Sequence, residues 1–155
     1  MKIAIGSDHR GRHTVEHIAD LLTQRGLEVS IIGACGAQSC DYPESAYQVG
    51  MAVSRGQADR GILICGTGIG MSIAANKVHG VRAAVVHDEL TAQLSRTHND
   101  ANVLCLSADL LGERLIDNIV EIWLKSEFEG GRHARRVAKI AMIEMGKNPA
   151  EAPAE

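Results

Sequence analysis

The chain has 155 residues, of which 45% are hydrophobic and 23% are charged, as is typical of one soluble globular domain. This composition excludes a disordered, collagen-like or coiled-coil chain. Lys and Arg number 16 against 19 Asp and Glu, for a formal charge of -3, and aromatic residues make up 3%, so neither a general nucleic-acid-coating surface nor a base-stacking surface is expected.

Short apolar runs alternate with longer segments of helical periodicity. In chain order we expect a strand at 2–6, a helix with an apolar stripe over 15–22, a strand at 27–32, a loop at 33–43, a helix at 44–55, a strand at 61–65, a glycine-rich turn and a helix through 76, a strand at 81–86, a helix at 89–96, a strand at 102–106, and helices at 110–125 and about 132–145. Such alternation implies a parallel sheet covered by helices on both faces. The sequence therefore predicts a three-layer α/β/α domain with a five-stranded parallel sheet over residues 1–146, followed by a flexible tail at 147–155.

The cysteines and the first residues of the chain indicate the cellular compartment in which the protein is expected. The N-terminus has no apolar stretch long enough for a signal peptide, and no run reaches the length of a membrane span. We therefore expect Cys35, Cys40, Cys65 and Cys105 to be free thiols, the first two in a loop and Cys105 as a small buried residue. The expected location is the cytoplasm.

The glycine-rich turn after the strand at 61–65 is a candidate site, because ligands bind beyond the carboxyl ends of the strands in such sheets. Gly66, Gly68 and Gly70 stand at alternate positions, and successive N–H groups there can form an anion-binding concavity. The spacing fits neither a Walker loop nor the full dinucleotide fingerprint. Cys65 enters this turn, where a helix N-terminus favours a reactive thiolate; the alternative is a small buried residue at a strand end.

Titratable side chains lie at other junctions between elements. Asp8 and His9 follow the first strand, and Asp8 either faces a ligand or caps the next helix. His98 follows the helix at 89–96 and either exchanges protons near neutral pH or is a surface histidine. Arg132 and Arg136 share a face in the first turns of the last helix, where cations oppose the helix dipole. They indicate either a bound anion or a solvated basic surface.

A metal site is conceivable where His9, His13 and His17 recur at every fourth position. The sequence offers no matched set of acidic ligands beside them, and it contains neither CxxC nor HExxH. We therefore expect no metal, and we take His13 and His17 as exposed helix positions.

Six segments carry a family resemblance that runs from residue 2 to about residue 143. They are GSDH at 6–9, DYP at 41–43, GILICGTGIG at 61–70, SIAANK at 72–77, SRTHNDANVL at 95–104 and EGGRH at 129–133. Together they resemble the type B ribose-5-phosphate isomerase family, which includes the allose-6-phosphate and galactose-6-phosphate isomerases. The resemblance implies a Rossmann-like domain that interconverts D-ribose 5-phosphate and D-ribulose 5-phosphate in the pentose phosphate pathway, through ring opening and a cis-enediolate and without cofactor or metal.

The same resemblance implies roles at matching positions. Cys65 moves the proton between C1 and C2, and Thr67 hydrogen-bonds near that thiol. His98 and Asp8 assist ring opening. The remaining implied contacts are with bound sugar phosphate: the N–H groups of Gly66, Gly68, Ile69 and Gly70 with the enediolate oxygen, Tyr42 and Asn99 with the sugar, and His9, Arg132 and Arg136 with the phosphate.

Assembly is implied as well. Family members are symmetric dimers in which the C-terminal helix crosses to the partner. We therefore expect a homodimer with shared active sites, and the sequence leaves open whether dimers pair into a tetramer. Arg132 and Arg136 would then serve Cys65 of the other subunit. One departure stands out: Asp109 occupies the position where several members carry a phosphate-binding Arg, and it either caps the next helix or faces the ligand.

Three alternative functions remain open at this stage. The first is an isomerase of another sugar phosphate, such as allose 6-phosphate, galactose 6-phosphate or a tetrose phosphate. The second is a sugar-phosphate-binding protein without catalysis, which would not need Cys65, His98 and Asp8 together. The third, a thiol redox protein, is disfavoured by the absence of CxxC.

Overall fold

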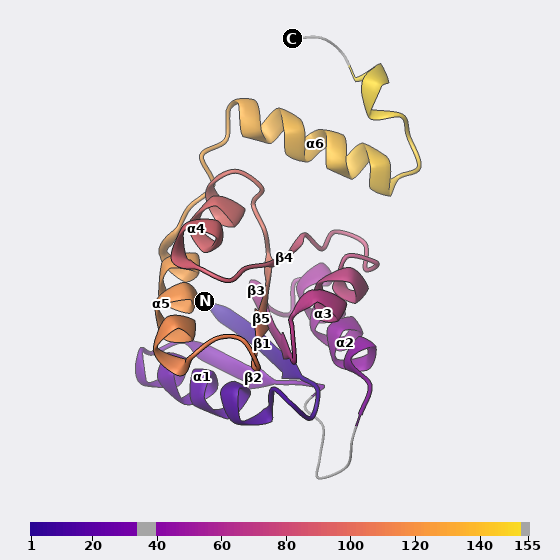
Figure 1. The fold of residues 1–155 in the computed structure, drawn as a ribbon. Helices are drawn as coiled ribbons and strands as arrows, with labels where there is room; N and C mark the ends of the chain where they lie inside the picture. Colours follow the sequence, from indigo (N-terminus) through magenta and orange to yellow (C-terminus); the bar gives the residue numbers. More distant parts are fainter. Residues whose placement is uncertain (34–39, 153–155) are drawn as a thin grey trace.

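The computed structural model describes residues 1–33 and 40–152. Its elements in chain order are β1 (Lys2–Ser7), α1 (Arg12–Gln24), β2 (Glu28–Ile31), α2 (Tyr42–Ser54), β3 (Arg60–Cys65), α3 (Ile69–Ala75), β4 (Ala83–Val85), α4 (Glu89–Thr97), β5 (Val103–Ser107), α5 (Glu113–Lys125), α6 (Arg132–Glu144) and the short 3-10 helix η1 (Pro149–Glu151). The strands form one parallel sheet in the order β2-β1-β3-β5-β4 (Figure 1). The predicted α/β class with a five-stranded parallel sheet is confirmed.

Helices cover both faces of this sheet because successive strand residues point to opposite sides, and both sides are apolar. One face packs against α1, α4 and α5, and the other against α2 and α3 (Figure 1). The strand residues on the first face include Ile3, Ile5, Ile62, Ile64, Leu104 and Leu106, and those on the second include Ala4, Leu63, Cys65, Val103 and Cys105. Cys65 therefore belongs to the α2–α3 side of the core.

Glycines in the sheet allow α2 to lie close against it. A Cβ atom on Gly61 would lie 2.7 Å from Val49 Cγ1, and one on Gly6 would lie 2.9 Å from Val49 Cγ2. A larger residue at either position would push the helix away from the strands. Because α2 runs back along the sheet, its first residue, Tyr42, is held at the edge where the strands end.

Two predicted helix boundaries are corrected by the structure. Helix α2 begins at Tyr42 rather than at residue 44, because Pro43 lies in the first turn, where no intrahelical N–H partner is needed. Helix α5 begins at Glu113 rather than at residue 110, because Gly112 has the extended conformation of an N-cap. Leu110, expected within that helix, is 65% exposed.

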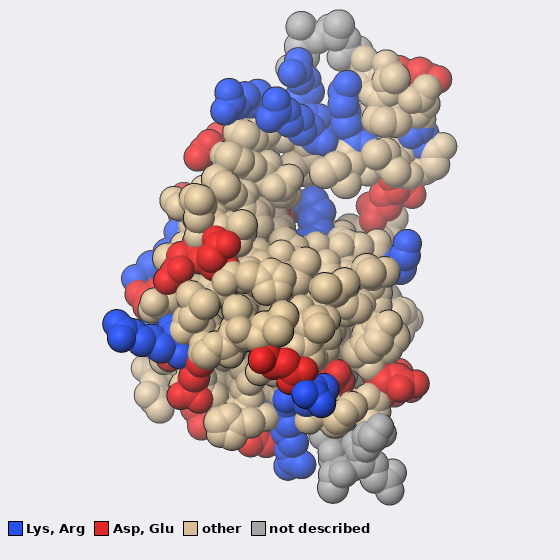
Figure 2. All heavy atoms as spheres, viewed as in Figure 1, with Lys and Arg blue, Asp and Glu red and all other residues tan. Residues whose placement is uncertain are grey.

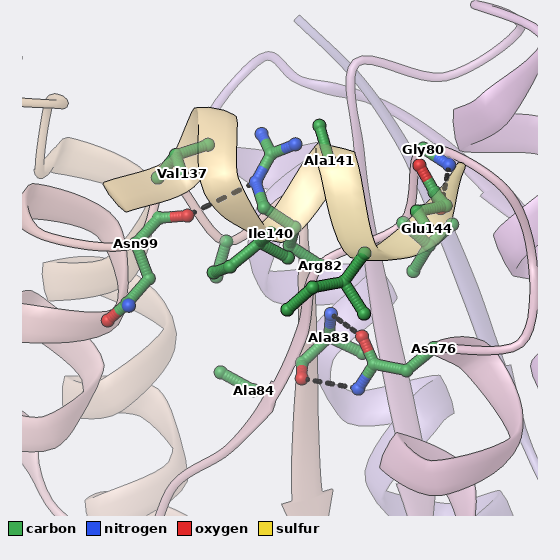
Figure 3. Close-up of a pocket in the computed structure, with 13 residues that line it drawn as sticks. Asn76, Gly80, Arg82, Ala83, Ala84, Asn99, Val137, Ile140, Ala141 and Glu144 are labelled. Carbon is green, nitrogen blue, oxygen red and sulfur yellow. Dashed lines mark hydrogen bonds between the residues drawn. The ribbon is translucent and has the colours of Figure 1, made fainter. Parts of the chain in front are cut away.

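Helix α6 stands apart from the layered body (Figure 1). His133 is its one buried residue, although the helix carries an apolar face. A cavity of about 480 Å³ opens between α6 and the segment leading into β4 (Figure 3). Its lining includes Val137, Ile140, Ala141 and Ile143 of α6. At the far end of the helix, Gly80 N donates to Glu144 Oε1 at 2.7 Å.

The structure changes the expectation for one cysteine. Cys40 is disulfide-bonded, whereas Cys65 and Cys105 are free; Cys35 lies outside the described residues. The expectation of free thiols was wrong for Cys40 because it rested on the redox compartment, which does not decide whether two sulfurs lie within bonding reach. Within residues 1–33 and 40–152, no helix has the length and apolar content needed to cross a membrane.

Candidate active site

The carboxyl ends of β1, β3 and β5 meet at one edge of the sheet. Ser7 pairs with Ile64 and Cys65 with Ser107, so the residues that follow all three strands emerge side by side. Backbone hydrogen bonds continue past the strands, from Asp8 N to Ile64 O and from Ala108 N to Cys65 O. This edge, referred to below as the carboxyl edge, therefore holds the glycine loop in a fixed frame.

Cys65 ends β3 with its sulfur directed at the glycine loop. Gly68 N donates to Cys65 Sγ at 3.1 Å, and the side chain is almost fully buried. Gly68 adopts φ +77, a left-handed conformation that glycine reaches without strain, and this turn brings its N–H to the sulfur. Donation by a backbone N–H stabilises negative charge on the sulfur.

Thr67 and Tyr42 complete this side of the loop. Thr67 Oγ1 accepts from Ile69 N at 3.3 Å, and its hydroxyl can still donate a hydrogen bond to a ligand. The ring of Tyr42 packs closely against Gly70, since a Cβ on that glycine would lie 2.7 Å from two ring carbons. Tyr42 is thus placed beside the loop by close packing, as its predicted role in lining a sugar requires.

Asp8 supports the turn that follows β1. Its Oδ1 accepts from Arg10 N at 2.9 Å and from Gly11 N at 3.2 Å, at the start of α1. These bonds fix the turn between β1 and α1, but they do not cap the helix, because its N-cap is Gly11 and has no side-chain cap hydrogen bond. The role of Asp8 toward a ligand stays a prediction. Asp8 is buried and His9 beside it is exposed at the same edge.

Arg10 and Asp109 form an ion pair across the mouth of the glycine loop. Arg10 Nε lies 3.1 Å from Asp109 Oδ1 and 2.8 Å from Oδ2. The pair lies directly over Gly66, whose Cβ would come within 2.8 Å of Asp109 Oδ2. Hydrogen bonding to Asp109 raises the pKa of Arg10. Asp109 therefore holds the guanidinium of Arg10 at this edge. Arg10 was not predicted as a site residue from the sequence.

His98 and Asn99 lie at the opposite edge of the sheet, beyond the amino ends of the strands. They follow α4 and precede β5, and Gly61 N at the start of β3 bonds to Asn102 O at the start of β5. A six-residue strand spans about 17 Å between these edges. His98 is therefore separated from the Cys65 of its own chain by the length of a strand.

Arginines fix the turn that carries His98 and Asn99. Arg96 NH1 donates to Asp100 Oδ1 at 2.8 Å, and Arg82 NH2 donates to Asp100 Oδ2 at the same distance. Arg82 Nε also donates to the backbone oxygen of Asn99 at 3.1 Å (Figure 3). Asp100 takes the unusual φ of 47, which these charged contacts hold in place.

The start of α6 packs against His98 at this second edge. The rings of His98 and His133 stack with centroids 4.1 Å apart and planes 5° from parallel. Arg132 Nε lies 3.4 Å from His133 Nε2. Burial, then the nearby His98 and Arg132 charges, lower the pKa of His133. His133 was quoted in the EGGRH segment but given no role, because its contact with His98 is not visible in the sequence.

Basic side chains gather over α6, where Figure 2 shows them as the blue group at the top of the molecule. They come from Arg132, Arg135, Arg136, Lys139 and Lys147. Arg132 and Arg136 are exposed one helical turn apart, as their spacing predicts. The predicted site residues thus fall into two groups: Asp8, His9, Tyr42, Cys65 and the loop from Gly66 to Gly70 at the carboxyl edge, and His98, Asn99, Arg132 and Arg136 at the other, the amino edge.

Comparison with known proteins decides the family. A sequence model described as Ribose/Galactose Isomerase matches residues 3–140. The chain belongs to the Ribose/Galactose Isomerase family. Ribose-5-phosphate isomerase B of Escherichia coli is 48% identical to this family member over 147 residues, which cover 95% of this chain and 99% of the relative.

Solved structures from the same family share the fold. Ribose-5-phosphate isomerase B of Clostridium thermocellum superposes with a TM-score of 0.93 at 54% identity, covering 94% of this chain and 99% of the other. The enzyme of Mycoplasma genitalium, solved with bound ribulose-5-phosphate, superposes with a TM-score of 0.90 at 44% identity and covers 93% of this chain and 96% of its own.

Proposed function

We propose that this chain interconverts D-ribose 5-phosphate and D-ribulose 5-phosphate. Its family membership and the printed activity of the E. coli relative support the reaction, and the ribulose-5-phosphate in the M. genitalium structure supports the substrate. The observation that carries the proposal is the Cys65 sulfur, held 3.1 Å from Gly68 N at the carboxyl edge. This edge is where a parallel α/β sheet binds its ligands.

The reaction needs one base and a place for negative charge. The Cys65 thiolate takes the proton from C2 of the open-chain aldose, and the electron pair moves through the C1–C2 bond to the C1 oxygen. The resulting cis-enediolate oxygen is stabilised by backbone N–H groups of the loop from Gly66 to Gly70. The thiol then returns the proton to C1, while the hydroxyl proton passes from the C2 oxygen to the C1 oxygen, giving the ketose.

Ring opening and phosphate binding use residues of both groups. His98 exchanges a proton with the ring oxygen and Asp8 assists, while His9, Arg132 and Arg136 hold the phosphate at a distance from the reacting carbons. Binding energy from the phosphate then contributes to catalysis without any contact at the reacting atoms. Tyr42 and Asn99 line the sugar between them.

A symmetric dimer brings these groups together, because one chain cannot. Cys65 and His98 lie at opposite edges of the same sheet, about a strand length apart. A twofold axis that sets the carboxyl edge of one chain against the amino edge of its partner completes two identical sites. In such a dimer the apolar residues of α6, which line the cavity in Figure 3, and the basic surface of α6 in Figure 2 meet the partner subunit.

Coupled assays over a panel of aldose phosphates test the substrate. We expect the highest kcat/KM on ribose 5-phosphate, with lower values on allose 6-phosphate, galactose 6-phosphate and a tetrose phosphate. A higher value on one of the other sugars assigns the chain to that substrate instead. Binding of ribose 5-phosphate without turnover would identify a binding protein. The cytoplasmic location stays a prediction, and the Cys40 disulfide removes one of its premises.

A further inference from the structure

Three potential metal ligands converge where α4, the segment before α6 and α6 itself meet. One nitrogen from each of His98 and His133 and one carboxylate oxygen of Glu129 all lie within 4.8 Å of one another. His133 is buried, His98 is half-buried and Glu129 is exposed, so the cluster opens to solvent on one side. The His133 Nε2 to Glu129 Oε2 distance is 3.7 Å.

Backbone hydrogen bonds hold these three residues in register. Glu129 N donates to Thr97 O at 3.1 Å, which ties the segment before α6 to the last residue of α4, next to His98. His133 N donates to Gly130 O at 3.0 Å. Gly130 has φ +67, a left-handed conformation suited to glycine, and this turn places Glu129 and His133 on the same side. The cluster is therefore built by the fold and not by flexible side chains alone.

We propose that His98, Glu129 and His133 form a zinc-binding site. Two imidazoles and one carboxylate are a donor set that Zn²⁺ takes in tetrahedral sites with a fourth position left open. Zinc bonds of about 2.0–2.1 Å place tetrahedral donors roughly 3.4 Å apart. The donors here lie up to 4.8 Å apart, so they need to close by up to about 1.4 Å, which the exposed Glu129 side chain can follow. The parallel rings of His98 and His133 must also turn about χ2, a broad torsion, until both lone pairs point at the ion.

One neighbour opposes the ion. Arg132 Nε lies 3.4 Å from His133 Nε2, so its cation must turn away when zinc binds. Arg132 is exposed, so its side chain can turn toward solvent. Repulsion from Arg132 and Arg136 weakens the affinity, which suits a reversible site rather than a permanent structural one.

Zinc at this cluster inhibits the isomerase, a consequence that rests on the proposed function. His98 needs a free ring nitrogen to exchange a proton during ring opening, and a coordinated nitrogen cannot do so. Zinc binding itself depends only on the geometry of the cluster.

Zinc binding is measured on the full chain by competition with a fluorescent chelator, in phosphate-free buffer. The Cys65→Ser background removes the reactive thiol, which is a competing zinc ligand. We expect about one zinc ion per chain. His133→Asn and Glu129→Gln in this background should each weaken binding by at least about tenfold. Glu129 is exposed, so the second variant reports on the site even if the buried His133 variant folds poorly.

His79→Asn is the matched control. His79 Nε2 lies 3.6 Å from Glu144 Oε2, an imidazole–carboxylate pair outside the cluster, and its removal should leave zinc affinity unchanged. Equal zinc affinity in the parent, His133→Asn and Glu129→Gln proteins would overturn the site.

Inhibition is measured separately, with Cys65 intact, as the zinc concentration that halves each protein's own zinc-free rate. Glu129→Gln should raise that concentration. If zinc binds the cluster without inhibiting, the site stands and the role of His98 in the reaction is overturned.

Discussion

At the scale of single residues, two cysteines on neighbouring strands differ in their surroundings. Cys65 and Cys105 contribute to the same side of the core. Cys105 is fully buried, and burial raises the pKa of its thiol, so it stays protonated and inert. Cys65 stands at the end of its strand and meets the N–H of Gly68 instead. A shift of two residues along the strands thus separates the sulfur beside the glycine loop, which we propose as the base, from a sulfur enclosed in the core.

Substitution of the two cysteines tests this contrast. Cys65→Ala should lower kcat by at least about 10²–10⁴-fold, because the base is gone while the fold and phosphate binding remain. Cys105→Ala, the matched control, should cost about 1 kcal/mol of stability and keep the activity. Iodoacetamide should inactivate the parent protein, more slowly when ribose 5-phosphate is bound. Full activity in Cys65→Ala would remove the sulfur from the mechanism.

His98 can be tested separately from proton transfer. His98→Asn should slow turnover of ribose 5-phosphate, which must open its furanose ring, by about 10²-fold or more. A tetrose 4-phosphate cannot close a furanose ring, because its O4 is phosphorylated, so the variant should lose little on it if the parent protein accepts this substrate. Steady-state kinetics on both sugars gives the comparison. Equal losses on the two sugars would contradict the assignment of His98 to ring opening.

At the scale of elements, the local part of the fold was predictable and the long-range part was not. Alternating apolar strands and amphipathic helices predicted every strand of the sheet within three residues, because each pattern is local. The Arg10–Asp109 pair joins residues 99 positions apart, and the His98–His133 stack joins α4 to α6. Neither contact leaves a periodic signal. The resemblance identified Cys65 and the loop, yet it could not show that Asp109 is bound by a cation from another strand end.

The packing of α6 on α4 predicts a pH-dependent stability. Burial and nearby cations lower the pKa of His133 in the folded chain from the ordinary value of 6.5. Between the lowered folded pKa and 6.5, the unfolded chain binds more protons than the folded one, so stability rises with pH across this window and is lost as pH falls through it. In the presence of a chelator, thermal unfolding of the parent protein at pH 7.5 and 5.5 should show this loss.

The His133→Gln variant isolates that contribution, since glutamine does not titrate. Its melting temperature should fall less than that of the parent between the two pH values. His79→Gln controls for the removal of an exposed imidazole, whose side chain is 79% exposed. A parallel decline in the parent and in His133→Gln would show that other groups set the acid sensitivity.

At the scale of the whole molecule, topology separates the chemistry into halves. In a parallel sheet the strands all end at one edge, and each crossover helix returns the chain to the other. Residues that follow strands, such as Cys65, are therefore on the opposite side from residues that follow helices, such as His98 and Arg132. The catalytic set proposed for this chain draws on both classes, so the proposal requires a second chain.

Mixed dimers test the shared site. Cys65→Ala alters the carboxyl edge and Arg136→Ala the amino edge, and each homodimer should be nearly inactive. In a heterodimer with shared sites, one site carries both substitutions and the other carries neither. Random reassortment makes half of the dimers heterodimers, each with one intact site of two, so co-refolding should recover roughly a quarter of the parent activity.

The control for this experiment mixes two variants of the same edge. His98→Asn and Arg136→Ala both alter the amino edge, so each site of their heterodimer carries one substitution and activity should not return. Differently tagged chains, purified through both tags, prove that heterodimers have formed. If the Cys65→Ala and Arg136→Ala heterodimer stays inactive, each site takes all its groups from one chain. In that case α6 and the amino edge must move by about a strand length to reach Cys65.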